Sequence, residues 1–262
     1  MDSKQRSRLL YRRQYIYGPK VEGFTSWQRF QLPNGHELAV HPDLEHTRVE
    51  GINNTLIMLG YMLNPGDPEA DNAKVLHNLL GKYPDSRELI SGLDHVSGRF
   101  VLFIFSADEQ LVLMDAAGMR QVFHYRDGNG GLWLCAQPGL LQEIFNLSYS
   151  AEAQAFLDSP VIRASHEPWW PGTSTPFEGV KHLLPNHLLD LKTGEVRRYW
   201  PREALARYGV REGAEKSAAI LRGIMTAANH RFNLAMALTG GYDSRIVFAA
   251  CKEIVKDLHI YS

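Results

Sequence analysis

A glycine- and hydroxyl-rich segment near the C-terminal end of the chain has the residue types of a phosphate-binding loop. It reads Thr239-Gly240-Gly241-Tyr242-Asp243-Ser244, and it lies between the apolar stretch 232–238 and the stretch 245–256, whose apolar residues have helical spacing. Glycines at a strand-to-helix turn let backbone N–H groups face a ligand, and the positive end of the helix dipole favours phosphate. The same pattern is also expected of an ordinary turn whose Asp and Ser cap the helix. The residues alone leave both interpretations open.

If the segment binds phosphate, each polar residue in it has a role. Thr239 and Ser244 provide hydroxyl donors, and the Asp243 carboxylate could hold Mg²⁺ against the phosphates. A Walker-type Gly-x-x-x-x-Gly-Lys-Ser/Thr motif does not occur in the sequence. The candidate cofactor-binding residues are therefore Leu238, Thr239, Gly240, Gly241, Asp243 and Ser244, with Asp243 as the candidate metal ligand.

Histidine and cysteine give weaker signals. His36, His41 and His46 recur every five residues, a spacing that stacks them neither on one helix face nor on one strand face, so we expect solvent-exposed histidines rather than metal ligands. Cys135 and Cys251 have apolar neighbours and no metal-ligand spacing. We expect both to be buried structural thiols.

Composition limits the classes of function. The chain has 262 residues, of which 44% are hydrophobic, which excludes a disordered protein. Its 28 basic and 29 acidic residues give no overall reason to bind nucleic acid or an anionic membrane, so we interpret the cluster Arg6, Arg8, Arg12 and Arg13 as a solvated edge. The sequence contains neither a spanning apolar run nor an apolar signal core, which indicates a cytoplasmic protein.

The residues up to about 205 are rich in predicted strands. Apolar runs predict strands over 52–62, 100–105, 111–114, 122–125 and 132–135, and helical spacing predicts a helix over 73–83. The glycine-rich segment 127–131 lies between two strands and opens no helix, so we interpret it as a turn rather than a phosphate loop. Residues 188–191 and 196–200 indicate a hairpin.

A different pattern follows the hairpin. Pro201 is expected to open an alanine-rich helical region that runs to about Arg231. The strand 232–238, the loop, the helix 245–256 and a strand from Leu258 then form a β-α-β unit, which is the opening of a parallel sheet. The sequence therefore predicts two regions, 1–205 and 206–262.

Four segments, in order, resemble one known family. Residues 239–244 resemble the Ser-Gly-Gly-x-Asp-Ser pyrophosphate loop of N-type ATP pyrophosphatases. Residues 93–102 and 114–125 resemble the Gly-x-Phe-Ala-Phe strand and the Arg-Asp-x-x-Gly-x-x-Pro-Leu-Tyr-Tyr segment of class II glutamine amidotransferase domains. Residues 177–187 and 199–200 resemble the linker before a synthetase domain. Together they are similar to the asparagine synthetase-like family, and in particular to its β-lactam synthetase branch.

The resemblance implies an α+β fold in which an Ntn-type αββα sandwich, residues 1–205, precedes the beginning of an α/β parallel-sheet (PP-loop) domain, residues 206–262. In that family the first domain releases ammonia from glutamine with an N-terminal cysteine. The second adenylates a carboxylate with ATP and Mg²⁺ before an amine attacks, which gives an amide, AMP and pyrophosphate. ATP, Mg²⁺ and an unidentified pair of carboxylate and amine are thus the implied partners, without nucleic acid or membrane.

The chain departs from the family at its glutaminase residues. Asp2 occupies the nucleophile position, and the first hundred residues contain no cysteine. Leu59 stands where an oxyanion-hole Asn is expected, and Tyr61 stands where a Glu would bind the substrate amine. A carboxylate does not match the nucleophilicity of a thiolate, and the loss of one oxyanion donor costs about 10²–10³ in rate. We therefore assign no catalytic residue and expect an inactive glutaminase.

The chain also ends one strand after the loop, whereas relatives continue for hundreds of residues. We expect an incomplete synthetase region whose exposed strand edges favour pairing with a second copy, as a homodimer. The alternative interpretation is a non-catalytic Ntn-like scaffold or interaction protein with a vestigial nucleotide loop.

Overall fold

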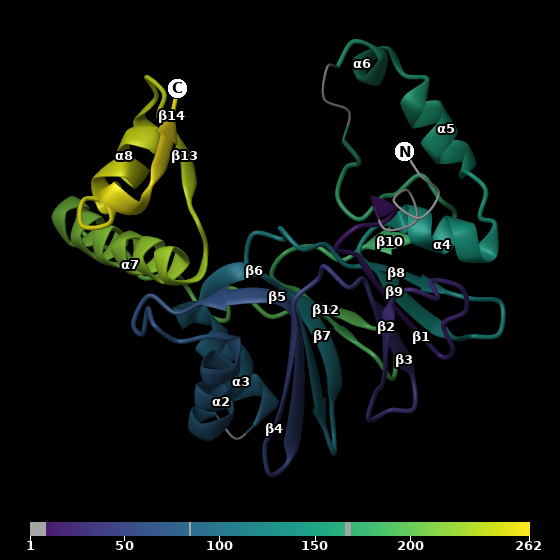
Figure 1. The fold of residues 1–262 in the computed structure, drawn as a ribbon. Helices are drawn as coiled ribbons and strands as arrows, with labels where there is room; N and C mark the ends of the chain where they lie inside the picture. The colour runs from purple at the N-terminus through teal and green to yellow at the C-terminus, as the bar shows by residue number, and fades with distance from the viewer. Residues whose placement is uncertain (1–8, 84, 166–168) are drawn as a thin grey trace.

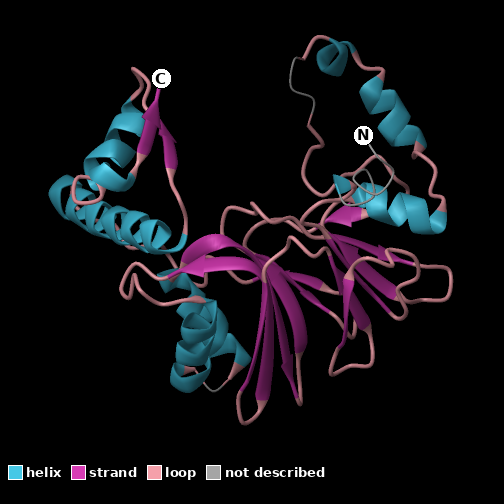
Figure 2. Cartoon of the chain, viewed as in Figure 1, coloured by secondary structure: helices cyan, strands magenta, loops and turns pink. Residues whose placement is uncertain are grey.

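The structure is a computed structural model that describes residues 9–83, 85–165 and 169–262. Two six-stranded antiparallel sheets face each other at its centre (Figures 1 and 2). The first sheet has the order β10 (Lys181–His182), β8 (Phe123–Arg126), β9 (Leu132–Cys135), β1 (Tyr15–Gly18), β3 (Glu37–Val40) and β2 (Gln28–Gln31). The second has the order β12 (Val196–Arg198), β11 (His187–Asp190), β7 (Gln110–Met114), β6 (Ser97–Ser106), β5 (Asn54–Leu63) and β4 (His46–Glu50).

The long strands β5 and β6 form the centre of the second sheet. They pair over their whole length, from Asn54 opposite Ser106 to Leu63 opposite Ser97. Side chains such as Leu59 pack between the two sheets, whereas neighbours such as Met58 pack on the opposite face. Both faces are therefore covered, which explains why the sequence here is a continuous apolar run rather than an alternating one.

Helices cover the outer face of each sheet. Helix α2 (Asn72–Lys82), helix α3 (Ser86–Gly92) and the 3₁₀ turn η1 (Leu93–His95) pack on the second sheet, and helix α4 (Pro138–Phe145) packs on the first. Figure 2 shows the resulting helix–sheet–sheet–helix order. The structure thus has the four-layer αββα architecture that was expected for this part of the chain.

An excursion from the first sheet carries two further helices, α5 (Ala151–Leu157) and α6 (Pro160–Arg163). Figure 1 shows them extending away from the sandwich, above α4. The excursion returns where Tyr149 bridges Phe177, and the chain then enters β10. The sequence predicted no helix over 151–163, so both short helices were missed.

The C-terminal unit, residues 206–262, consists of α7 (Val210–Arg231), β13 (Ala235–Ala237), α8 (Tyr242–Ala250), the 3₁₀ turn η2 (Val255–Asp257) and β14 (His259–Tyr261). Strands β13 and β14 pair in parallel, which confirms the predicted β-α-β connection. The unit buries little: only Ala227, Met236 and Cys251 are buried in it. A sheet of two short strands cannot enclose a core of its own.

Two helix boundaries differ from the predicted ones. Helix α7 begins at Val210, not at Pro201, which follows Trp200 through a cis peptide bond. Residues 201–209 are exposed and irregular, and the Leu205 and Tyr208 side chains stay exposed, so no packing stabilises a helix there. Helix α8 spans Tyr242–Ala250 rather than 245–256, so the helix begins inside the predicted loop.

The prediction of exposed histidines is wrong for His41. This side chain is buried, its ring meets Trp27 edge-on, and its Nδ1 accepts the Asp43 N–H at 3.0 Å. His36 and His46 are half-buried, because their rings pack on Tyr17 and Phe30. Aromatic packing thus holds these rings, and across the described ranges no group of His, Cys, Asp and Glu side chains is arranged to bind a metal ion.

The remaining sequence predictions have mixed outcomes. Cys135 and Cys251 are both buried, and Asp127–Gly131 forms the turn between β8 and β9, as expected. Arg6 and Arg8 lie outside the described residues, whereas Arg12 forms an ion pair with Asp43. Of the helices that the structure describes, none is long and apolar enough to cross a membrane.

Candidate functional site

The loop between β13 and α8 is closed by its own hydroxyl groups. The Ser244 hydroxyl accepts the Thr239 N–H at 3.2 Å and lies 3.0 Å from the Thr239 hydroxyl. At the base of the loop, the Leu238 N–H donates to the Tyr261 carbonyl at 2.7 Å. The residues predicted to bind a cofactor are thus brought together in one turn at the N-terminus of α8.

The helix-capping interpretation of this loop is not what the structure shows. Gly241 is the N-cap of α8, and no side chain caps the helix. Ser244 bonds within the loop instead, and within the described chain no hydrogen bond or ion pair holds the Asp243 carboxylate. The first amide donors of α8 therefore have no side-chain acceptor and can serve an external anion.

The two glycines leave the loop backbone open. Neither has a positive φ, so the turn itself does not require glycine. A Cβ added at Gly240 would meet nothing within 4 Å, and one at Gly241 would meet only the Thr239 hydroxyl at 3.5 Å. What glycine provides here is room for a ligand to approach the backbone. The chemistry of the loop, with open backbone, two hydroxyls and an unengaged carboxylate, fits a phosphate group with Mg²⁺.

Apart from this loop, a cavity of about 580 Å³ lies at one end of the space between the sheets. We call it the β5 pocket. It contains Tyr61, one of the residues at which the sequence departs from a glutaminase. Its lining residues are Arg12, Arg13, Gln14, Asp43, Leu44, Glu45, Gly60, Tyr61, Arg99, Arg120, Phe232 and Leu234. It therefore joins the start of β1, the end of β5 and the segment that enters β13.

The described residues of the β5 pocket do not include the groups that glutamine hydrolysis requires. Leu59 is fully buried in the core between the sheets, and Tyr61 places its ring 4.8 Å from that of Phe232. Arg12, Arg13 and Gln14, just before β1, line the pocket, whereas Asp2 lies outside the described residues. No thiol or aliphatic hydroxyl is found among the described residues that line it. The described lining residues thus include no thiol or aliphatic hydroxyl nucleophile for acyl transfer.

Neither of the two cysteines lines this pocket. Cys135 is on β9, its thiol donates to the Gln137 carbonyl at 3.0 Å, and burial raises its pKa well above the ordinary value. Cys251 follows α8, and burial raises its pKa as well. Protonated thiols of this kind are poor nucleophiles.

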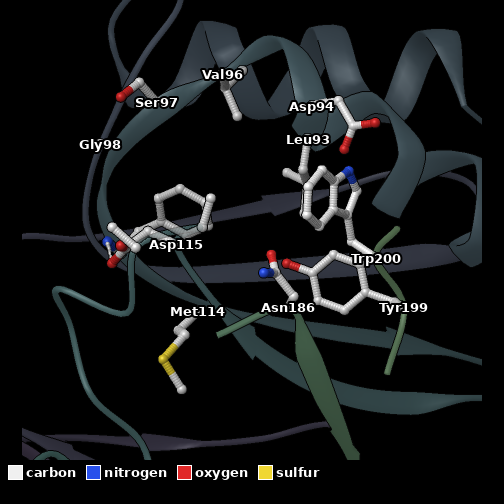
Figure 3. Close-up of a pocket in the computed structure, with 13 residues that line it drawn as sticks. Leu93, Asp94, Val96, Ser97, Gly98, Met114, Asp115, Asn186, Tyr199 and Trp200 are labelled. Atoms are coloured by element: carbon white, nitrogen blue, oxygen red, sulfur yellow. Dashed lines mark hydrogen bonds between the residues drawn. The ribbon is translucent and has the colours of Figure 1, made fainter. Parts of the chain in front are cut away.

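A second cavity, of about 390 Å³, lies between the start of β6 and residues 199–200 (Figure 3). Trp200 lies beside Leu93 and Asp94, and Tyr199 lies beside Asn186. Among its polar groups, Asp94 pairs with Arg202. Burial raises the pKa of Tyr199 to about 12.

Asp115 also lines this second cavity, and its carboxylate fixes nearby backbone by hydrogen bonds. Its carboxylate accepts the N–H groups of Phe100 (3.2 Å), Met119 (2.9 Å) and Arg120 (2.9 Å). With Asp94 paired and Asp115 committed in this way, neither carboxylate of the described lining is a free base. We therefore interpret the cavity as the place where Tyr199 and Trp200 pack rather than as a reaction site.

Comparison with known proteins adds a likeness of structure only. The sequence matches no family model and no curated protein. A glutamine phosphoribosylpyrophosphate amidotransferase from B. subtilis, complexed with ADP and GMP, is 10% identical, with a TM-score of 0.34 over 98% of this chain and 61% of that one. An allosteric regulatory enzyme of purine biosynthesis is 11% identical, with a TM-score of 0.38 over 93% and 58%. This chain spans less than two thirds of either length.

Proposed function

We propose that this chain is part of an ATP-dependent amide ligase of the asparagine synthetase type, in which a sandwich without glutaminase activity precedes the start of a synthetase domain. The observation that carries the proposal is the parallel β13–loop–α8–β14 unit. Its loop combines an open glycine backbone, two hydroxyls and a helix N-terminus that no side chain caps. These are the features that phosphate recognition requires.

Each loop residue has a defined part in this proposal. Gly240 and Gly241 admit the phosphates of ATP to the backbone amides, and Thr239 and Ser244 add hydroxyl donors. The exposed Asp243 carboxylate would hold Mg²⁺, acting through the metal rather than as a general base. ATP, when bound, supplies the adenylyl group that activates a carboxylate. The amine that follows must come from a source other than glutamine, because the β5 pocket presents no nucleophile among its described residues.

A calorimetric titration with pyrophosphate and with ATP–Mg²⁺ tests the loop. We expect the Gly241→Val variant to lose binding, since its side chain would stand where the phosphate meets the backbone. The Gly128→Val variant is a matched control in the β8–β9 turn, where a Cβ likewise meets nothing within 4 Å, and it should bind as the wild type does. Asp243→Ala should weaken binding only when Mg²⁺ is present.

Circular dichroism of each variant must first show an intact sandwich. If ATP–Mg²⁺ affinity is then the same in the wild type and in Gly241→Val, the ligase proposal fails. The alternative, a non-catalytic scaffold with a vestigial loop, would account for that result.

A further inference from the structure

The β5 pocket has an unusual balance of charge. Four arginines line it, Arg12, Arg13, Arg99 and Arg120, against two carboxylates, Asp43 and Glu45. A concave site with an excess of one charge concentrates ions of the opposite sign. The question is then which of these cations are already neutralised by the protein.

Both carboxylates are engaged with other groups. Asp43 forms an ion pair with Arg12, at 2.6 Å. Glu45 accepts from Arg231 at 3.0 Å and from the Asn72 amide at 2.7 Å.

The other three arginines of the pocket are not neutralised in this way. In the parts of the chain that the structure describes, no carboxylate lies within ion-pair distance of Arg13, Arg99 or Arg120. Three guanidinium groups therefore share one cavity without a counter-ion from the described residues.

Arg120 is held rigidly in this cluster. Its backbone N–H is fixed by the Asp115 carboxylate, and its Nη1 donates to the Arg13 carbonyl at 3.1 Å. Gly60 lets the guanidinium lie against β5, because a Cβ there would be 2.9 Å from the Arg120 Nε. This Nε is buried and has no hydrogen-bond partner in the described structure. A buried donor left without an acceptor is costly, and a bound acceptor would remove that cost.

The cations also disfavour one another. Burial, together with the nearby Arg99 charge, lowers the pKa of Arg120 below its ordinary value. The charged form of the Arg120 guanidinium is thus disfavoured by desolvation and by like-charge repulsion. A bound anion relieves both effects. Guanidinium forks match the oxygens of phosphate in bidentate geometry, which lysine would not do.

We infer that the β5 pocket is a binding site for a dianionic oxyanion, the phosphate group of a small molecule, held by Arg13, Arg99 and Arg120. The cavity of about 580 Å³ exceeds the size of one phosphate and leaves room for the rest of such a molecule beside Tyr61 and Phe232. The inference is independent of the ATP proposal, because the two sites share no residue.

The test is a titration of the full chain with inorganic phosphate by calorimetry at low ionic strength. Arg99→Gln and Arg120→Gln should each raise the Kd about tenfold or more, since each loses charge-assisted hydrogen bonds. Arg163→Gln, on α6, removes an equal charge from an exposed ion pair with Asp158, and it should change the Kd less than twofold. Acetate, with one charge, should bind more weakly than phosphate, and neutral glutamine should not bind.

A background variant separates this site from the phosphate loop. Phosphate binding by the β5 pocket should persist in Gly241→Val, whereas Arg99→Gln should leave pyrophosphate binding at the loop intact. If Arg120→Gln does not fold, the Arg99→Gln variant decides the test, because Arg99 is exposed and its replacement removes no buried side chain. A folded wild-type protein that binds no phosphate, or an Arg99→Gln variant with unchanged affinity in the Gly241→Val background, would overturn the inference.

Discussion

Arg231 and Glu45 lie 186 positions apart in the sequence, and in the structure the Arg231 Nη2 lies 3.0 Å from the Glu45 Oε1. Arg231 is in the last turn of α7, and it also donates to the Met62 carbonyl at 2.8 Å and to the Asn72 side-chain oxygen at 2.7 Å. Asn72 in turn donates to Glu45 and to the Gly60 carbonyl. This network attaches the C-terminal unit to the end of β5, beside the pocket that we propose for phosphate.

Replacing Arg231 with Met should therefore loosen the C-terminal unit. The substitution removes three hydrogen bonds from a side chain that is only 13% exposed, and we expect a loss of about 2 kcal/mol in the attachment. Amide hydrogen exchange should accelerate in the last turns of α7 and in β13, while β5 and β6 keep their protection. Arg211→Met, at an exposed i,i+4 pair with Glu215 on the same helix, is the control and should change exchange little. Equal exchange of α7 in the Arg231→Met variant and the wild type would contradict the assignment.

Gly60→Ala should destabilise the sandwich itself. Gly60 has φ = +107°, and an added Cβ would lie 2.1 Å from the Arg99 carbonyl oxygen on the neighbouring strand. Because that neighbour is backbone in a central strand pair, β5 and β6 must separate locally, at an expected loss of at least about 2 kcal/mol in the free energy of unfolding. Urea denaturation measures this loss in the free energy of unfolding. Gly128→Ala, in open space and without a positive φ, should stay within about 0.5 kcal/mol of the wild type.

The two longest strands that sequence reasoning found, β5 and β6, are those whose own residues determine them. β5 and β6 are buried on both faces, so their apolar runs are visible locally. β2 contributes only Phe30 to the core and is otherwise exposed, and it is a strand because it pairs with β3. Such pairing depends on a partner elsewhere in the chain, which a local pattern does not contain.

The same distinction applies to the two sites. The loop at 239–244 could be predicted because its residues are contiguous. Arg13, Arg99 and Arg120 come from three separate segments that the two sheets bring together, so no spacing in the sequence connects them. One local signal was present: Gly60 interrupts an apolar strand, which indicates a close backbone approach.

The protein should release no glutamate from glutamine. The described β5 pocket offers no thiol or aliphatic hydroxyl, and the Leu59 side chain is buried in the core and has no donor for an oxyanion. Incubation of the purified protein with glutamine, followed by an enzymatic assay of glutamate, measures the rate. Turnover within about a hundredfold of an ordinary kcat, near 10 s⁻¹, would show that a nucleophile reaches the pocket after all.

Protonation of His124 on β8 should make the protein less stable in acid. Burial, and then the charges of Lys181, Arg126 and His182, lower the pKa of His124 from 6.5 to about 4. Between these values the unfolded chain binds the proton and the folded one does not, so this contribution is complete above about pH 6.5 and is lost as the pH falls toward 4. In urea denaturation, the free energy of unfolding of the wild type should fall between pH 7 and about pH 4.5 by about 2 kcal/mol more than that of His124→Gln. His77→Gln, at an exposed position on α2, should follow the wild type, and parallel curves for the wild type and His124→Gln would refute the assignment.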